Sequence, residues 1–201
     1  MNHRDKTIQT RAAGNSLLAG QPQPDSSKLI LTGNPIVYDV PTLLDVIDGQ
    51  KFYEVIKRGA LTGADTSDFV FYCEHTGRVY ARSRNGSIKL TETEQGAEVY
   101  IELDGNDEGH RQLYNDVKAG RLDRMSFQFR IAKEEFDRAI NTFIIHRFAK
   151  LFDISAVAFP AYDMAHITAR CAAVLGEHRQ GQQVENCNRE RVAAFALSLT
   201  I

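Results

Sequence analysis

The stretch "RMSFQFRIAKEEFDRA" (residues 124–139) decides the fold class, because its first half alternates apolar and polar side chains. Alternate side chains of a β-strand point to opposite faces, so this pattern predicts a strand with one face in the core. The apolar face consists of Met125, Phe127 and Phe129, and the polar face consists of Ser126, Gln128 and Arg130. The hydroxyl of Ser126 belongs either to an ordinary strand serine or to a nucleophile, if the chain also supplies a base.

The segments around this stretch share its two-residue period. Together with "NTFIIHRFAKLFDISAVAFP" (141–160), it predicts two or three strands, with a turn near Asn141. Upstream strand candidates are "KLILTGNPIVYDV" (28–40, broken by a turn at 33–35), "DFVFYCEH" (68–75), "GRVYARSRNGSIKLTE" (77–92) and "GAEVYIELD" (96–104). Asn85-Gly86 is the strongest hairpin signal among them.

Helical periodicity is confined to two places. In residues 105–120, the spacing of Leu113 and Val117 predicts a short helix, and Gly120 suits the position just after its end. Residues 40–61 predict partly helical structure, interrupted at Gly49. Many short strands with few helices predict a mostly β, α+β fold, a small antiparallel β-barrel ringed by short helices.

The length of 201 residues suits one domain with tails, or at most two small domains. Residues 1–27 are polar and predict a flexible N-terminal arm, with a first strand allowed at its end. Residues 28–166 hold the strand candidates and form the expected domain. Residues 167–201 have a Gln- and Asn-rich middle and predict a C-terminal tail that is loosely docked or disordered.

Charge and cysteine content exclude several classes of function. The chain has 24 Lys and Arg against 26 Asp and Glu, which gives no broad basic surface for nucleic acid or membrane binding. Three scattered cysteines favour a reducing compartment, and the N-terminus lacks the apolar core of a secretion signal. We therefore expect no nucleic-acid partner, no membrane association and no secretion.

Three residues on separate predicted strands, His75, Ser126 and Asp153, are candidates for a catalytic set. His75 ends the run 68–75 and by parity shares a face with Phe71 and Cys73; imidazole can accept and return the proton of a serine. Asp153 begins an apolar strand segment and can orient an imidazole, and Ser155 competes for either role. Each also has an ordinary interpretation: a surface histidine, a strand serine bonded to the backbone, and a charge at a strand end.

Metal chemistry is the rival interpretation. Cys73 and His75 could share a strand face, and His146 and His166 are available elsewhere. No second ligand pair completes a tetrahedral zinc set, so we expect neither a metal nor another cofactor.

Two segments resemble the tailed-bacteriophage prohead (capsid maturation) serine proteases of the HK97 type. "GRLDRMSFQF" (120–129) is similar to that family's Met/Leu-Ser-Phe-Gly-Phe segment, and "DISAVAFPAYDMA" (153–165) is similar to its Glu-Val-Ser-x-Val-x-Phe-Pro-Ala segment. "FYEVIKRGAL" (52–61) adds support. The chain departs from the family in having Gln128 for a glycine, Asp153 for a glutamate, and Glu74 and Thr76 around the histidine.

The resemblance implies an endopeptidase related in fold to the herpesvirus assembly proteases. It matches Ser126 to the nucleophile, His75 to the general base and Asp153 to the third member, with Gln128 and Arg130 near the substrate or oxyanion. The implied partners are the major capsid protein, its scaffold segment and the protease itself, as a substrate and in a possible homo-oligomer. The implied location is the procapsid interior in the host cytoplasm, where the tails 1–27 and 167–201 suit self-cleavage. The alternatives are a non-catalytic assembly module of the same fold and a metal-dependent hydrolase.

Overall fold

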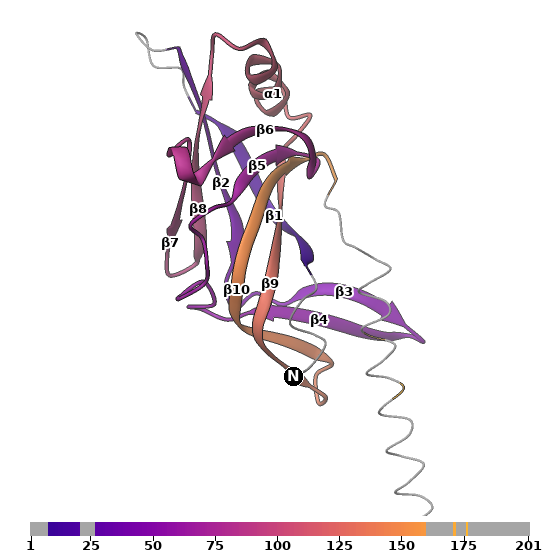
Figure 1. Cartoon of the computed structure of the whole chain (residues 1–201). Helices are drawn as coiled ribbons and strands as arrows, with labels where there is room; N and C mark the ends of the chain where they lie inside the picture. The colour runs from indigo at the N-terminus through magenta and orange to yellow at the C-terminus, as the bar shows by residue number, and fades with distance from the viewer. Residues whose placement is uncertain (1–7, 21–26, 160–170, 172–175, 177–201) are drawn as a thin grey trace, which may run out of the picture.

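The computed structural model describes residues 8–20, 27–159, 171 and 176. Its strands form one sheet in the order β3-β4-β10-β9-β1-β2-β8-β7, and β5 pairs with both β10 and β6 beside this path. The strands are β1 (Gln9–Ala19), β2 (Lys28–Val37), β3 (Thr42–Ile47), β4 (Gln50–Ile56), β5 (Val70–Cys73), β6 (Thr76–Arg82), β7 (Ile88–Glu92), β8 (Gly96–Asp104), β9 (Arg124–Asp137) and β10 (Thr142–Val157), and the helices are η2 (Ser83–Asn85) and α1 (Glu108–Lys118). Figure 1 shows β9 and β10 side by side along the molecule, with the β3–β4 hairpin toward one end and α1 at the other.

The antiparallel pair β9–β10 forms the centre of the fold. The alternation of side chains in β9 confirms the predicted apolar face, because Met125, Phe127 and Phe129 are buried in the main hydrophobic cluster. On β10, Ile154 and Ala156 lie opposite Phe127 and Met125 and are buried in the same cluster. Each strand therefore packs one face into the core and presents its alternate residues on the other face.

One edge of β10 carries two parallel partners in succession. β4 pairs with residues 142–145, and β5 pairs with residues 153–156. Between these strands the chain follows the same edge, through hydrogen bonds from Phe148 N to Ala60 O and from Asp65 N to Ala149 O. This path brings the end of β5 beside the carboxyl-terminal end of β10.

The observed sheet is mostly antiparallel but is not a closed barrel. The described hydrogen-bonded path runs from β3 to β7 without joining its own ends. The prediction of a mostly β, α+β fold is confirmed, whereas a ring of helices is not observed, since α1 is the one α-helix with described bounds. Helix α1 has Leu113, Tyr114 and Val117 buried, and Gly120 adopts a φ of 71° just after its end, as expected.

The helical prediction for residues 40–61 is wrong, because β3 and β4 form an antiparallel hairpin there. The turn residues Asp48 and Gly49 both have positive φ, at 52° and 77°, which a tight two-residue hairpin needs. Leu44 and Phe52 pack with Phe143 in a second, smaller cluster. Burial on that cluster outweighs the helix-like spacing of the apolar residues.

Two turn predictions also differ from the structure. Gly86 does adopt a positive φ of 77°, but it caps η2 and connects β6 to β7, which pair with β5 and β8 rather than with each other. Residues 33–35 do not separate two strands, because β2 continues through them with a shift in register.

The tails are only partly described. Residues 9–19, within the expected N-terminal arm, form β1 between β9 and β2. Most of the expected C-terminal tail lies outside the described residues, although Cys171 is buried in the smaller cluster.

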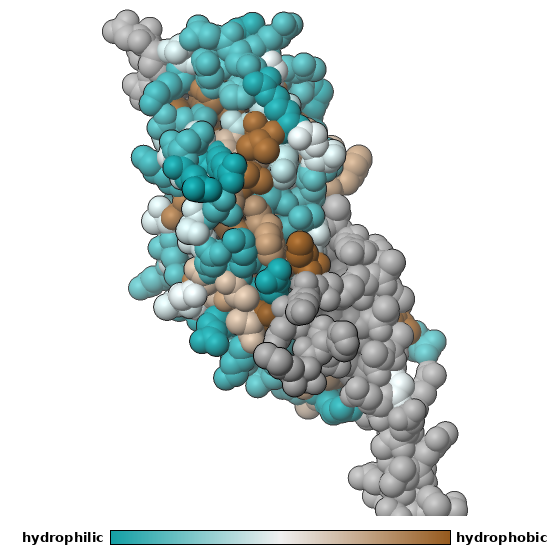
Figure 2. All heavy atoms as spheres, viewed as in Figure 1, coloured by the Kyte–Doolittle hydropathy of each residue, from teal (hydrophilic) through white to brown (hydrophobic). Residues whose placement is uncertain are grey.

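Figure 2 shows a strip of apolar surface down the middle of one face, bordered by hydrophilic residues. None of the described helices is long and apolar enough to cross a membrane.

Candidate active site

A two-residue turn after β5 positions His75. Glu74 and His75 have φ values of 54° and 56°, and Cys73 pairs with Thr76 across the turn. Positive φ is uncommon for residues other than glycine and costs roughly 1–2 kcal/mol per residue. The turn is held against β10 by hydrogen bonds from Glu74 N to Ala156 O at 3.0 Å and from Ala158 N to the Glu74 carboxylate at 2.8 Å.

The alternation of the strand predicts His75 on the same face as Phe71 and Cys73, and this turn shows that prediction to be wrong. Cys73 continues the core face of β5 and packs against the main cluster. The His75 ring instead contacts side chains of the opposite face of β10, because the positive φ angles break the alternation. His75 therefore lies on the polar face, away from Phe71 and Cys73.

The imidazole of His75 is held by Asp153 and Ser155. Nδ1 of His75 lies 2.7 Å from Oδ1 of Asp153 and 3.1 Å from the hydroxyl of Ser155. The Ser155 hydroxyl also donates to Oδ1 of Asp153 at 2.9 Å. The side chains of His75 and Asp153 are only 11% and 4% exposed, so their contact is largely shielded from water.

Ser126 lies on the same face as this group. It sits directly opposite Ser155 in the β9–β10 pair, and opposite residues in an antiparallel pair have Cβ atoms about 4.5–5.5 Å apart. Ser126 is fully buried, and its hydroxyl donates to the backbone carbonyl of Arg11 in β1 at 2.8 Å. The fold thus gathers His75, Ser126 and Asp153, which are separated by up to 78 positions in the sequence.

The second nitrogen of the imidazole is available. Nε2 of His75 is buried and has no hydrogen-bond partner among the described residues. Buried polar atoms are nearly always paired, so an unpaired one needs an explanation, and a catalytic role is one such explanation. With Nδ1 occupied by the carboxylate, Nε2 is the atom that could accept a proton.

The two other predicted site residues lie along the same strand. Gln128 is half-buried opposite Asp153 on one side and Thr10 on the other. Arg130 is four residues from Ser126, about 13 Å along an extended strand, and its guanidinium stacks on Phe152 at 5.3 Å. Gln128 is therefore beside the candidate set, and Arg130 is not brought to it.

The residues of the metal hypothesis do not converge. Cys73 and His75 point to opposite faces, and His146 lies farther along β10 beside Glu135. Burial also raises the pKa of the Cys73 thiol, which disfavours the thiolate that zinc binds. The described residues contain no group of three or more metal-ligating side chains, and His166 lies outside them.

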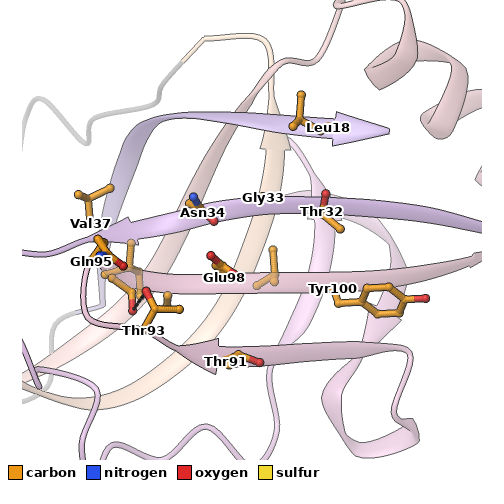
Figure 3. Close-up of a pocket in the computed structure, with 14 residues that line it drawn as sticks. Leu18, Thr32, Gly33, Asn34, Val37, Thr91, Thr93, Gln95, Glu98 and Tyr100 are labelled. Atoms are coloured by element: carbon orange, nitrogen blue, oxygen red, sulfur yellow. Dashed lines mark hydrogen bonds between the residues drawn. The ribbon is translucent and has the colours of Figure 1, made fainter. Parts of the chain in front are cut away.

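A sizeable surface hollow lies elsewhere. Its volume is about 790 Å³, and it lies over β2, β7 and β8. Figure 3 shows its lining, which is mostly uncharged and includes Thr32, Asn34, Thr93 and Tyr100, with the carboxylate of Glu98. None of the candidate catalytic residues lines it, so it offers no acid–base chemistry to the candidate set.

Comparison with known proteins connects this arrangement to a family. A family model described as caudovirus prohead serine protease matches residues 20–179, which is most of the chain. The chain belongs to the caudovirus prohead serine protease family. No curated protein and no solved structure matches it significantly.

Membership in this prohead protease family makes the chain a serine protease and supports a role in capsid maturation. The relation to herpesvirus proteases stays a prediction. The match begins at residue 20, so β1 lies before the matched segment although it pairs with the strand that carries Ser126. Two residues that contact the site were not predicted from the sequence. The Glu74 carboxylate accepts a hydrogen bond that holds the His75 turn, and the Arg11 carbonyl accepts the hydrogen bond of Ser126. No sequence pattern indicated either contact.

Proposed function

We propose that this prohead protease hydrolyses peptide bonds with Ser126 as nucleophile, His75 as general base and Asp153 as the residue that orients His75. The observation that supports this best is the pairing of Nδ1 of His75 with Asp153, while Nε2 is buried without a described partner. Such an imidazole has its tautomer fixed and its other nitrogen ready to accept a hydroxyl proton.

The reaction is acyl transfer in two stages. The Ser126 oxygen attacks the carbonyl carbon of the scissile bond while its proton passes to His75, and His75 then gives the proton to the departing amine. Water hydrolyses the acyl-enzyme with the same base. Asp153 stabilises the imidazolium formed at each stage, and its near-complete burial strengthens that interaction.

The Ser126 hydroxyl donates to Arg11 in the structure, so catalysis requires it to turn toward His75. Rotation about one side-chain bond is a small change, and catalytic hydrogen bonds are often incomplete before substrate binds. Ser155 is the less suitable nucleophile, because it bonds the same ring nitrogen that Asp153 occupies.

The proposed substrates are the capsid protein's scaffold segment and the protease itself, inside the procapsid in the host cytoplasm. The family match supports capsid maturation as the setting. A scaffold segment would present exposed, flexible chain, which proteases cleave most readily.

The test is a comparison of two serine variants. Ser126→Ala should fold with an unchanged circular dichroism spectrum and lose trimming of itself and of co-expressed capsid protein. Ser155→Ala should retain the nucleophile and measurable cleavage, at a lower rate. If Ser126→Ala still trims in a protease-free background and Ser155→Ala does not, the nucleophile is Ser155.

A further inference from the structure

Strand β1 lies across the proposed nucleophile in the manner of a bound peptide. Residues 9–11 pair antiparallel with residues 127–129 of β9, and the next residue, Ala12, lies opposite Ser126. Extended peptides bind many proteins by adding a strand to a sheet edge in this way, with main-chain hydrogen bonds and side-chain pockets. The sequence of this segment, "QTRAA" (9–13), is polar for a strand in the middle of a sheet.

One carbonyl of this strand contacts the proposed nucleophile. The Ser126 hydroxyl donates to the carbonyl oxygen of Arg11 at 2.8 Å, so the carbonyl carbon of Arg11 lies one bond beyond the atom it touches. Ser126 is fully buried, so β1 must move before an external substrate can reach the hydroxyl. The peptide bond beside the nucleophile is therefore the one that joins Arg11 to Ala12.

The Arg11 side chain occupies a specific, buried pocket. Its guanidinium donates to both oxygens of the Glu54 carboxylate, at 2.5 Å and 2.7 Å, and both residues are only 3% exposed. The guanidinium carbon lies 5.6 Å from the centre of the Phe129 ring, within the range of a cation–π interaction. The planar fork of arginine matches a carboxylate better than the single ammonium of lysine.

We infer that the Arg11–Ala12 bond is a self-cleavage site. Residues 9–11 then occupy the substrate positions on the amino-terminal side of the cleaved bond, and Glu54 selects a basic residue immediately before that bond. This inference rests on the proposed function. It also assigns a substrate class: extended segments with arginine, and less effectively lysine, immediately before the scissile bond.

The self-cleavage step balances as an acyl transfer. The Ser126 oxygen bonds to the Arg11 carbonyl carbon, the bond to the Ala12 nitrogen breaks, and His75 moves the serine proton to the new Ala12 amine. Water then hydrolyses the ester, which releases residues 1–11 with a carboxylate on Arg11 and restores Ser126.

Release of residues 1–11 uncovers the part of β9 that pairs with residues 9–11, while other strand pairs of the sheet stay intact. Residues 17–19 of β1 remain paired with β2, and Leu17 N still bonds to the carbonyl of Asp123. The edge of β9 at residues 127–129 then becomes free to pair with a substrate strand. The Glu54 carboxylate that held Arg11 then becomes available to a basic side chain of the substrate.

The first experiment measures the amino terminus of the purified full-length chain by intact mass and amino-terminal sequencing. We expect a product that begins at Ala12, which is absent from Ser126→Ala and from Arg11→Leu, while Arg11→Lys is processed more slowly. If the wild-type chain cleaves capsid protein yet keeps residues 1–11, the inference is overturned and the proposed function stands.

The second experiment uses fluorogenic peptides spanning residues 7–16 with Arg, Lys, Leu or Glu at position 11. We expect kcat/KM for the Arg peptide to exceed that for the Leu peptide about 100-fold, because leucine cannot make the two hydrogen bonds that the Arg11 guanidinium makes to the Glu54 carboxylate. Glu54→Gln should reduce this ratio to about tenfold or less, because a neutral amide pairs less strongly with a guanidinium. Equal cleavage of the Arg and Leu peptides by the wild-type chain overturns the specificity. Absence of Ser126-dependent cleavage of any peptide or capsid protein overturns the proposed function as well.

Discussion

Glu74 accepts a hydrogen bond from the backbone N–H of Ala158, at 2.8 Å, and so fastens the turn that carries His75 to the end of β10. The same residue donates its own N–H to the carbonyl of Ala156, at 3.0 Å. Because Asp153 and Ser155 lie on this same strand, the two bonds set where the imidazole meets them.

Replacing Glu74 should misplace His75 without unfolding the chain. Glu74→Ala removes the side-chain bond to Ala158, and we expect kcat to fall about tenfold with KM little changed, since small displacements of a catalytic group are costly. Glu74→Gln keeps an accepting oxygen and should retain most activity. Peptide kinetics and a thermal melt of both variants check this. A Glu74→Ala variant with the wild-type kcat would show that the turn is positioned by its backbone alone.

Substitution of Asp153 should remove the orienting carboxylate. In Asp153→Asn the amide can donate to Nδ1 of His75 and stabilise the wrong tautomer, so we expect kcat to fall by up to about 10⁴-fold. The melting temperature, measured alongside, should fall far less than it would for a disrupted core. Activity within about twofold of the wild type would remove Asp153 from the catalytic set.

Gly96 should be intolerant of a side chain. A Cβ at this position would lie 2.0 Å from the carbonyl oxygen of Ile36, across the β2–β8 pair. We expect Gly96→Ala to lower the free energy of unfolding by about 3 kcal/mol, as overpacking against rigid backbone does. Gly20→Ala is the matched control, since its Cβ would approach nothing closer than 3.4 Å. Urea unfolding of both variants measures the difference, and equal midpoints would contradict the expectation.

The start of α1 should lose stability in acid. The ion pair with Arg78, and then the bond from the backbone of His110, lower the pKa of Asp107 to about 2. A lowered pKa stabilises the folded state above the unfolded value of about 4, and this contribution disappears as the pH falls from about 4 to about 2. Asp107→Ala should therefore melt below the wild type at pH 7. Melts followed by circular dichroism at pH 7 and pH 2 should show that difference shrinking. A constant difference would mean that the carboxylate charge is not the cause.

The amino-acid sequence by itself determined the central strands and several of their details. The alternation of residues 125–130 correctly assigned Met125, Phe127 and Phe129 to the core, because side-chain direction in a strand depends only on local geometry. Gly120 marked the region just after α1 for an equally local reason, its tolerance of positive φ. The family resemblance, confirmed by the match to residues 20–179, also came from the sequence alone.

Tertiary structure decided what local patterns could not. His75 was assigned to the wrong face, because two consecutive positive φ angles in a non-glycine turn are imposed by contacts with β10. Residues 40–61 became a hairpin because burial against Phe143 outweighed their helix-like spacing. The pairing of Arg11 with Glu54 joins residues 43 positions apart. Local propensity carries no information over such a separation, so only the folded sheet could place the amino-terminal strand across Ser126.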